Sequence, residues 1–92
     1  MEILEEKIRN IIYFNERTAT QIIRQLNAEE GVELGFTRDG EDDYQNSIYE
    51  IMDIVMAMVN LLRNGQIDRR HIVENRGKRE IHTQIYRRCS NY

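Results

Sequence analysis

The chain has 92 residues, of which 40% are hydrophobic and 32% are charged, and its net charge is −3. This length corresponds to one domain, and the composition is too apolar for a disordered protein. The single cysteine, Cys89, excludes an intramolecular disulfide and a cysteine-rich zinc site.

The N-terminal part of the chain is predicted to form two amphipathic helices. Apolar residues recur at steps of three and four between Leu4 and Leu26, which is the helical pattern. A polar stretch at 15–18 interrupts the pattern for a full turn, and Thr18 or Thr20 can cap a fresh helix. We therefore predict helices over residues 2–14 and 18–28, with one continuous helix as the alternative.

An acidic connector is predicted over residues 29–43. It holds three glycines and seven acidic residues against one arginine, Arg38, a composition typical of turns. Alternating apolar residues at Val32, Leu34 and Phe36 allow a short strand within it.

The strongest predicted helix covers residues 42–64 and ends at Asn64-Gly65. Ile54, Met56 and Leu61 fall off its main apolar stripe. A helix that is apolar on more than one side either lies at the centre of the core or also covers a partner. We expect a homodimer built on this helix, with these three residues at the interface; a role in the core alone is the alternative.

The C-terminal part is predicted to form a β-hairpin. Two runs rich in β-branched residues, 71–73 and 81–86, flank a polar stretch that contains Asn75 and Gly77. A helix through 80–88 is the alternative. The fold expected from these patterns is one domain, residues 1–92, mainly α-helical with a C-terminal β-hairpin.

Charge is distributed unevenly along the chain. Residues 1–62 hold 13 acidic and 5 basic side chains, whereas residues 63–92 hold 3 acidic and 8 basic. Such polarity is typical of a protein whose basic end meets nucleic acid or an acidic partner, and a solvated surface is the alternative.

Two segments resemble a winged helix-turn-helix domain. The sequence VNLLRNGQIDRR at residues 59–70 is similar to the end of that family's third helix and the start of its wing, and TATQIIRQL at 18–26 is similar to its second helix. The resemblance implies a winged-helix-like small domain with a wing at residues 71–87 that binds double-stranded DNA. Two features depart from the family. About fifteen residues separate the second and third helices, and the start of the third helix is acidic, where carboxylates would repel phosphates.

The leading hypothesis is a small dimeric regulator of transcription that binds DNA through its wing. Lys and Arg neutralise phosphates, and the candidate contacts are Arg69, Arg70, Arg76, Lys78 and Arg79. The alternative is a protein-interaction or inhibitor module with a DNA-mimicking acidic surface at Glu41, Asp42 and Asp43. Small, proline-free, charge-polarised chains of this kind are typical of phages and other mobile elements.

The sequence contains no grouping typical of catalysis or cofactor binding. The consecutive acids at 39–43 lack the alternating spacing of a calcium loop. His71 and His82 could face each other across the hairpin, but two histidines without a third ligand make a poor metal site. We therefore expect no enzyme activity, metal, cofactor or small-molecule substrate.

The expected location is the cytoplasm. The acidic N-terminus lacks the basic-then-apolar order of a signal peptide, and a lone thiol suits a reducing compartment. The longest near-apolar run, residues 54–62, is nine residues long, far short of the ~20 needed to span a bilayer.

Overall fold

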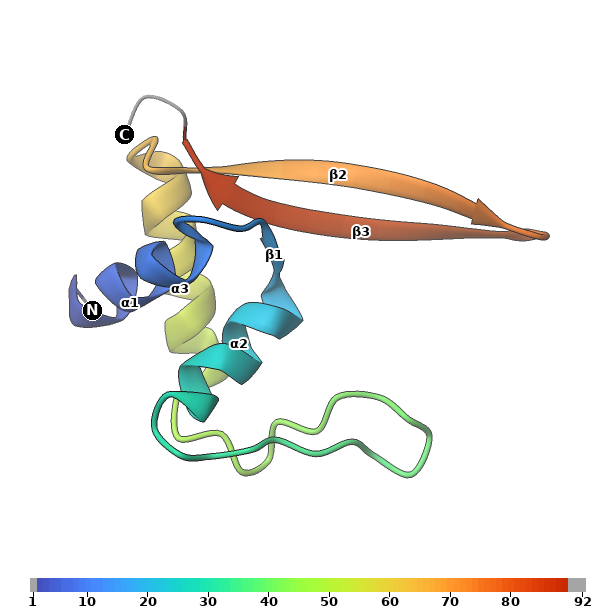
Figure 1. Ribbon diagram of the computed structural model, residues 1–92, viewed down its shortest axis with the longest axis horizontal. Coiled ribbons are helices and arrows are strands. Elements are labelled where there is room, and N and C mark those ends of the chain that lie inside the picture. The colour runs from blue at the N-terminus through green and yellow to red at the C-terminus, as the bar shows by residue number, and fades with distance from the viewer. Residues whose placement is uncertain (1, 90–92) are drawn as a thin grey trace.

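The computed structural model describes residues 2–89, which form three helices and one three-stranded antiparallel sheet. The helices pack together, and two long strands project from them as a hairpin (Figure 1). The elements in chain order are α1 (Glu2–Ile12), β1 (Arg17–Thr18), α2 (Ala19–Ala28), α3 (Ile51–Arg63), β2 (Ile67–Arg76) and β3 (Arg79–Arg88).

The prediction of a mainly α-helical fold is wrong, because strands make up a large part of the chain. β2 and β3 have ten residues each and pair along their whole length, from Ile67–Arg88 to Arg76–Arg79. β1 pairs with β3 at Tyr86 and Ile85, which gives the sheet order β1-β3-β2. The fold therefore combines helices and a sheet, and its two-residue strand β1 is too short to leave a periodic signal in the sequence.

The two N-terminal helices are separate, as predicted. Thr18 caps α2: its side-chain oxygen accepts from the backbone N–H of Gln21 at 3.2 Å, and the Gln21 side chain accepts from the N–H of Thr18 at 2.9 Å. This reciprocal pair is a capping box, which satisfies two backbone donors that the helix itself leaves open. The capping box explains why the chain restarts a helix at this point.

Helix α3 begins at Ile51, so the predicted helix over 42–64 is nine residues too long at its start. Residues 29–50 form an irregular loop, hereafter the acidic loop, whose regular pairing is one isolated bridge between Phe36 and Asp42. The predicted end of the helix is confirmed. Gly65 has φ +69°, and the N–H groups of Gly65 and Gln66 donate to the carbonyls of Leu62 and Leu61, which is a Schellman motif.

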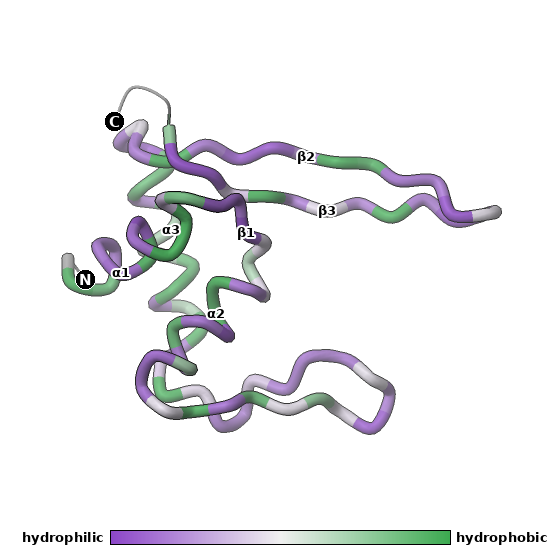
Figure 2. Tube along the Cα trace, viewed as in Figure 1, coloured by the Kyte–Doolittle hydropathy of each residue, from purple (hydrophilic) through white to green (hydrophobic). Residues whose placement is uncertain are grey.

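The hydrophobic core lies between the three helices. Figure 2 shows hydrophobic segments concentrated there, whereas β2 and β3 are largely hydrophilic. No helix in residues 2–89 is long and apolar enough to cross a membrane. The buried core residues are Leu4, Ile8, Ile12, Ile22, Ile23, Leu26, Leu34, Ile54, Ala57, Met58, Leu61 and Ile67.

Candidate functional site

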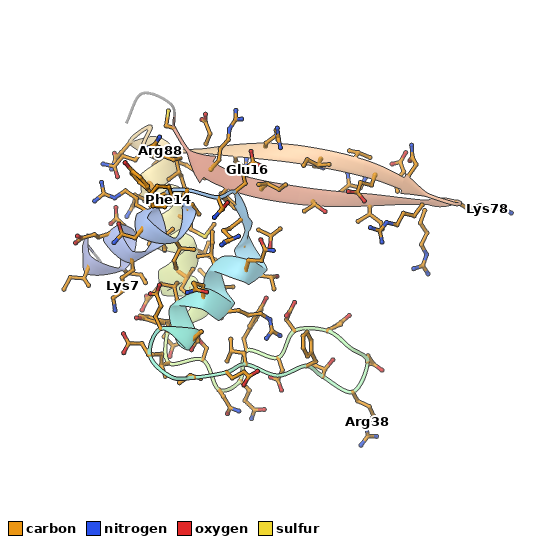
Figure 3. All side chains as sticks on the ribbon, viewed as in Figure 1. Lys7, Phe14, Glu16, Arg38, Lys78 and Arg88 are labelled. Carbon is orange, nitrogen blue, oxygen red and sulfur yellow. The ribbon has the colours of Figure 1, made fainter. Side chains whose placement is uncertain are left out.

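Within residues 2–89, the hairpin formed by residues 67–88, hereafter the hairpin arm, is attached to the body only near its base. Ile67 is buried there, and Tyr86 packs against the core. Every residue from 73 to 82 is exposed. The arm extends well beyond the helices, with Lys78 at its tip (Figures 1 and 3). The wing expected at 71–87 lies within this arm, and the strands continue to its base.

The five predicted DNA-contact residues lie on the arm in two groups. Arg69 and Arg70 are near its base on β2, whereas Arg76, Lys78 and Arg79 surround the turn at its tip. A strand rises about 3.3 Å per residue, so roughly 20 Å separates the two groups. The structure therefore spreads these cations along one projection and does not gather them in one cluster.

The tip concentrates positive charge. Arg76 and Arg79 are directly paired partners in the β2–β3 register, so their side chains leave the same face of the arm, with Lys78 in the turn between them. Like charges directly opposite each other on neighbouring strands are destabilising. The ion pair of Arg76 with Glu74 offsets part of this repulsion, and an anionic ligand would offset more of it.

Acidic neighbours neutralise some cations of the arm. Arg70 pairs with Glu16 at 3.0 Å, Arg76 with Glu74 at 3.4 Å, and Arg87 approaches Asp68 at 4.0 Å. Within residues 2–89, Arg69, Lys78 and Arg79 form no ion pair. Of the five predicted contacts, these three cations are the most available to a phosphate.

A groove of about 270 Å³ lies at the base of the arm, where the end of α1 meets β2 and β3. Arg9 and Arg88 are among its lining residues, and the Arg88 guanidinium lies 4.3 Å from the centre of the Tyr13 ring. Sequence reasoning missed Arg9, because the pattern of α1 gives no sign that this helix ends beside the last strand. The lining of the groove is mostly apolar, and Arg9 and Arg88 add two cations to it.

The acidic loop is held in place by side chains from α1 and α2. The Arg24 guanidinium donates to Asp42 Oδ1 at 2.7 Å and to the carbonyl oxygens of Leu34 and Gly35, and it lies 4.2 Å from the centre of the Phe36 ring. One side chain thus joins both sides of the loop.

Two further residues fix the ends of the loop. Asn27 is fully buried; its amide donates to Ser47 Oγ and accepts from the N–H of Ile48 at 2.8 Å. Lys7 donates to Tyr49 Oη and to Glu30, each at 3.0 Å. The hydrogen bond to Tyr49 is the largest cause and the one to Glu30 the next, and together they raise the pKa of Lys7 above its usual range.

The three acids predicted to form one partner surface have different roles in the structure. Asp42 is half-buried and paired with Arg24, and Asp43 is half-buried and accepts from the N–H of Gln45 at 3.0 Å. Glu41 is exposed. They also lie in the loop, so the prediction that they start the third helix is wrong. Arg24, eighteen positions away from Asp42, gives no local sequence signal of this pairing.

The expected dimer residues on α3 are only partly available. Ile54 and Leu61 are fully buried in the core, whereas Met56 is exposed. Assigning Ile54 and Leu61 to a partner surface is therefore wrong. Met52 and Val55 on the same helix are exposed as well. A helix with apolar residues on all sides gives no unique stripe, and packing against the other helices decides which side is inward.

His71 and His82 do face each other diagonally across the arm. His71 Nε2 lies 2.9 Å from His82 Nδ1, and His82 Nε2 lies 3.3 Å from Glu80 Oε2. Which ring nitrogen donates in the His71–His82 hydrogen bond depends on the tautomers of the two imidazoles. The residues from 2 to 89 contain no group of three metal-ligating side chains placed to hold an ion.

Comparisons of the sequence with protein-family models, with curated proteins and with solved structures found no match. The resemblance to winged helix-turn-helix domains therefore stays a prediction. The binding of DNA and the binding of a protein partner also stay predictions.

Proposed function

We propose that this chain is a small, non-enzymatic DNA-binding protein of the winged helix-turn-helix type, whose hairpin arm makes the main contact with the duplex. The observation that carries the proposal is the tip of the arm, where Arg76 and Arg79 are direct cross-strand partners beside Lys78. A phosphate backbone would relieve their repulsion and release counterions.

The shape of the arm suits this role. A two-stranded β-ribbon fits the major groove of B-DNA, which is about 12 Å wide. Residues 73–82 are exposed on both faces, so the distal arm can enter a groove without any rearrangement of the core. The order of three helices followed by a hairpin supports the winged-helix resemblance.

Helix α3 is a poor candidate for the groove, although the family resemblance assigns it that place. Its outward residues include Met52, Val55 and Met56, which offer no hydrogen bonds to bases, and Asp53 in its first turn repels phosphates. The proposed contact is therefore mainly with the phosphate backbone of the DNA. It is made by the arm and by Arg9 and Arg88 at the base of the arm. Such binding discriminates weakly between sequences.

The test is a salt titration of binding to a short random-sequence duplex, followed by fluorescence anisotropy. Each phosphate contact contributes about 0.9 to the slope of log affinity against log salt. Changing Arg76, Lys78 and Arg79 together to Ala should lower the slope by about two to three. Arg38→Ala removes a cation from the acidic loop, the other projection (Figure 3), and should leave the slope unchanged.

The proposal fails if the wild-type protein does not bind DNA at about 50 mM salt, where electrostatic contacts are strongest. It also fails if the triple variant and Arg38→Ala have equal slopes. Location in the cytoplasm belongs to the same proposal, because a lone Cys89 suits a reducing compartment.

The second candidate is a protein-interaction module that uses the acidic loop. The observation in its favour is that this loop also projects from the body, with Glu41 and the apolar ring of Phe36 exposed. An oligo-arginine peptide is a simple probe for such a surface. Glu41→Lys should weaken its binding strongly and the triple arm variant should not, whereas equal effects of both changes argue against this candidate.

A further inference from the structure

The outward side of α3 is an apolar stripe. Met52 is 66% exposed, Val55 42% and Met56 46%, and Val59 is half-buried. These positions follow the i, i+3, i+4, i+7 spacing of one helix face. Ile48, in the loop just before the helix, is also an exposed apolar residue, at 52%. Contiguous exposed apolar surface of this kind marks an interaction site.

We infer that this stripe docks against the same stripe of a second copy of the chain, with the two α3 helices antiparallel. A two-fold interface uses one surface twice and must be self-complementary. A two-fold axis that passes beside Val55 and Met56 meets that requirement. It places Met52 opposite the partner subunit's Val59, and Val59 opposite the partner subunit's Met52. Apolar side chains then meet apolar side chains from Met52 to Val59.

The charges that flank the stripe select the antiparallel direction. Glu50 occupies the N-cap position of α3, where its side chain makes no capping hydrogen bond, and Asp53 lies in the first turn, whereas Arg63 lies in the last turn. Arg63 follows Met52 and Met56 by eleven and seven positions, so it continues the same helix face. Within residues 2–89, Glu50, Asp53 and Arg63 form no ion pair.

Antiparallel pairing places each Arg63 beside the acidic start of the partner helix, and it sets opposite ends of the two helix dipoles together. Parallel pairing would place like charges side by side. The dimer does not depend on DNA binding. A failure of the dimer inference would be seen in the measured mass of the protein, and a failure of the DNA proposal in the fluorescence anisotropy. The two failures can therefore be distinguished.

The first experiment measures mass by light scattering or sedimentation from low to high micromolar concentration. The wild-type protein should form a dimer, and Met56→Glu should form a folded monomer, because it buries an unpaired charge at the seam. Phe14→Glu is the matched control. It places the same charge at an 87% exposed apolar residue after α1 and should leave the dimer intact.

A wild-type monomer at the highest concentration overturns the inference, and so does a dimer that Met56→Glu leaves intact. Circular dichroism and the melting temperature identify a Met56→Glu chain that has not folded, and Met52→Glu then replaces it at the other exposed methionine. If neither variant dissociates the dimer, the interface lies elsewhere.

The second experiment tests the direction of the helices by exchanging charges. Arg63→Glu should weaken the dimer about five- to tenfold, because two symmetric pairs are lost and each exposed pair contributes little. Adding Asp53→Arg and Glu50→Arg to this variant should restore the dimer. If Met56→Glu dissociates the dimer but the exchanged charges do not restore it, the antiparallel arrangement is wrong.

Discussion

The acidic loop and the hairpin arm both project from the helical body on the same side in Figure 1, yet they are stabilised in different ways. The arm has a complete ladder of ten paired residues on each strand and few contacts with the body beyond its base. The loop has one isolated bridge, but side chains of Lys7, Arg24 and Asn27 hold it at its ends and middle. A regular backbone is therefore no guide to how firmly a segment is tied to the core.

The largest effect is expected from Asn27→Leu, which breaks the attachment of the loop. Asn27 is fully buried, and the change leaves the N–H of Ile48 without its acceptor and removes a partner from Ser47 Oγ. Burying an unsatisfied polar group costs about 1–3 kcal/mol, so the free energy of unfolding in urea should fall by about 2–3 kcal/mol. Asn46→Leu, in the same loop but exposed, is the control. Equal losses for both variants would contradict this account.

A smaller and more local effect is expected from Arg24→Ala. The Arg24 side chain is one quarter exposed, so solvent screening limits its contribution to about 1 kcal/mol of unfolding free energy. Hydrogen exchange should accelerate in residues 34–43 and stay unchanged in the arm. Arg24→Lys should recover little, because one ammonium group cannot reproduce the planar fork that joins Asp42, Leu34 and Gly35. Uniform acceleration across the chain would show that the loop is not a separate unit.

The complementary test disturbs the arm alone. Gly77 has φ +64° at the first position of the two-residue turn, a conformation that costs other residues about 1–2 kcal/mol. Gly77→Val should therefore accelerate exchange in the distal arm, residues 73–82, and change global unfolding by less than about 0.5 kcal/mol. Lys78→Val, at the neighbouring position without a positive φ, is the control. A large loss of global stability for Gly77→Val would show that the arm and the core unfold together.

The smallest effect is expected from Lys7→Met. Because its hydrogen bonds to Tyr49 and Glu30 raise the pKa of Lys7, folding holds this proton more tightly. The contribution to stability is complete below the ordinary lysine pKa of about 10.4 and is lost as the pH rises through the higher folded value. Between neutral and strongly alkaline pH, the free energy of unfolding should therefore decrease less steeply for Lys7→Met than for the wild-type protein. Parallel curves would show that these contacts do not stabilise the fold.

Local patterns allowed much of the fold to be predicted from the sequence. The Thr18 cap, the glycine end of α3 and the hairpin are all determined by residues close together in the chain. The start of α3 was misplaced because acidic residues at 42–43 suit a helix start, whereas Arg24 and Asn27 draw the preceding segment into a loop. Such long-range hydrogen bonds have no periodic signature.

The candidate site was predicted less well than the fold. The basic arm residues were identified from composition, but their separation into a basal and a distal group depends on the ten-residue strands. Which acid neutralises which arginine depends on cross-strand register and on Glu16, far away in the chain. The inward side of α3 could not be chosen from its own sequence, because both sides carry residues suited to a core.

The paired strands of the arm also have an open border. β1 is only two residues long and reaches β3 only at Tyr86 and Ile85, so beyond them both margins of the hairpin present backbone N–H and C=O groups that another extended chain could join. Proteins discourage such joining with charged side chains at exposed strand margins. The arginines on the two strands of the arm fit this pattern, and variants that replace them with alanine should be checked for fibrous self-association before they are tested for DNA binding.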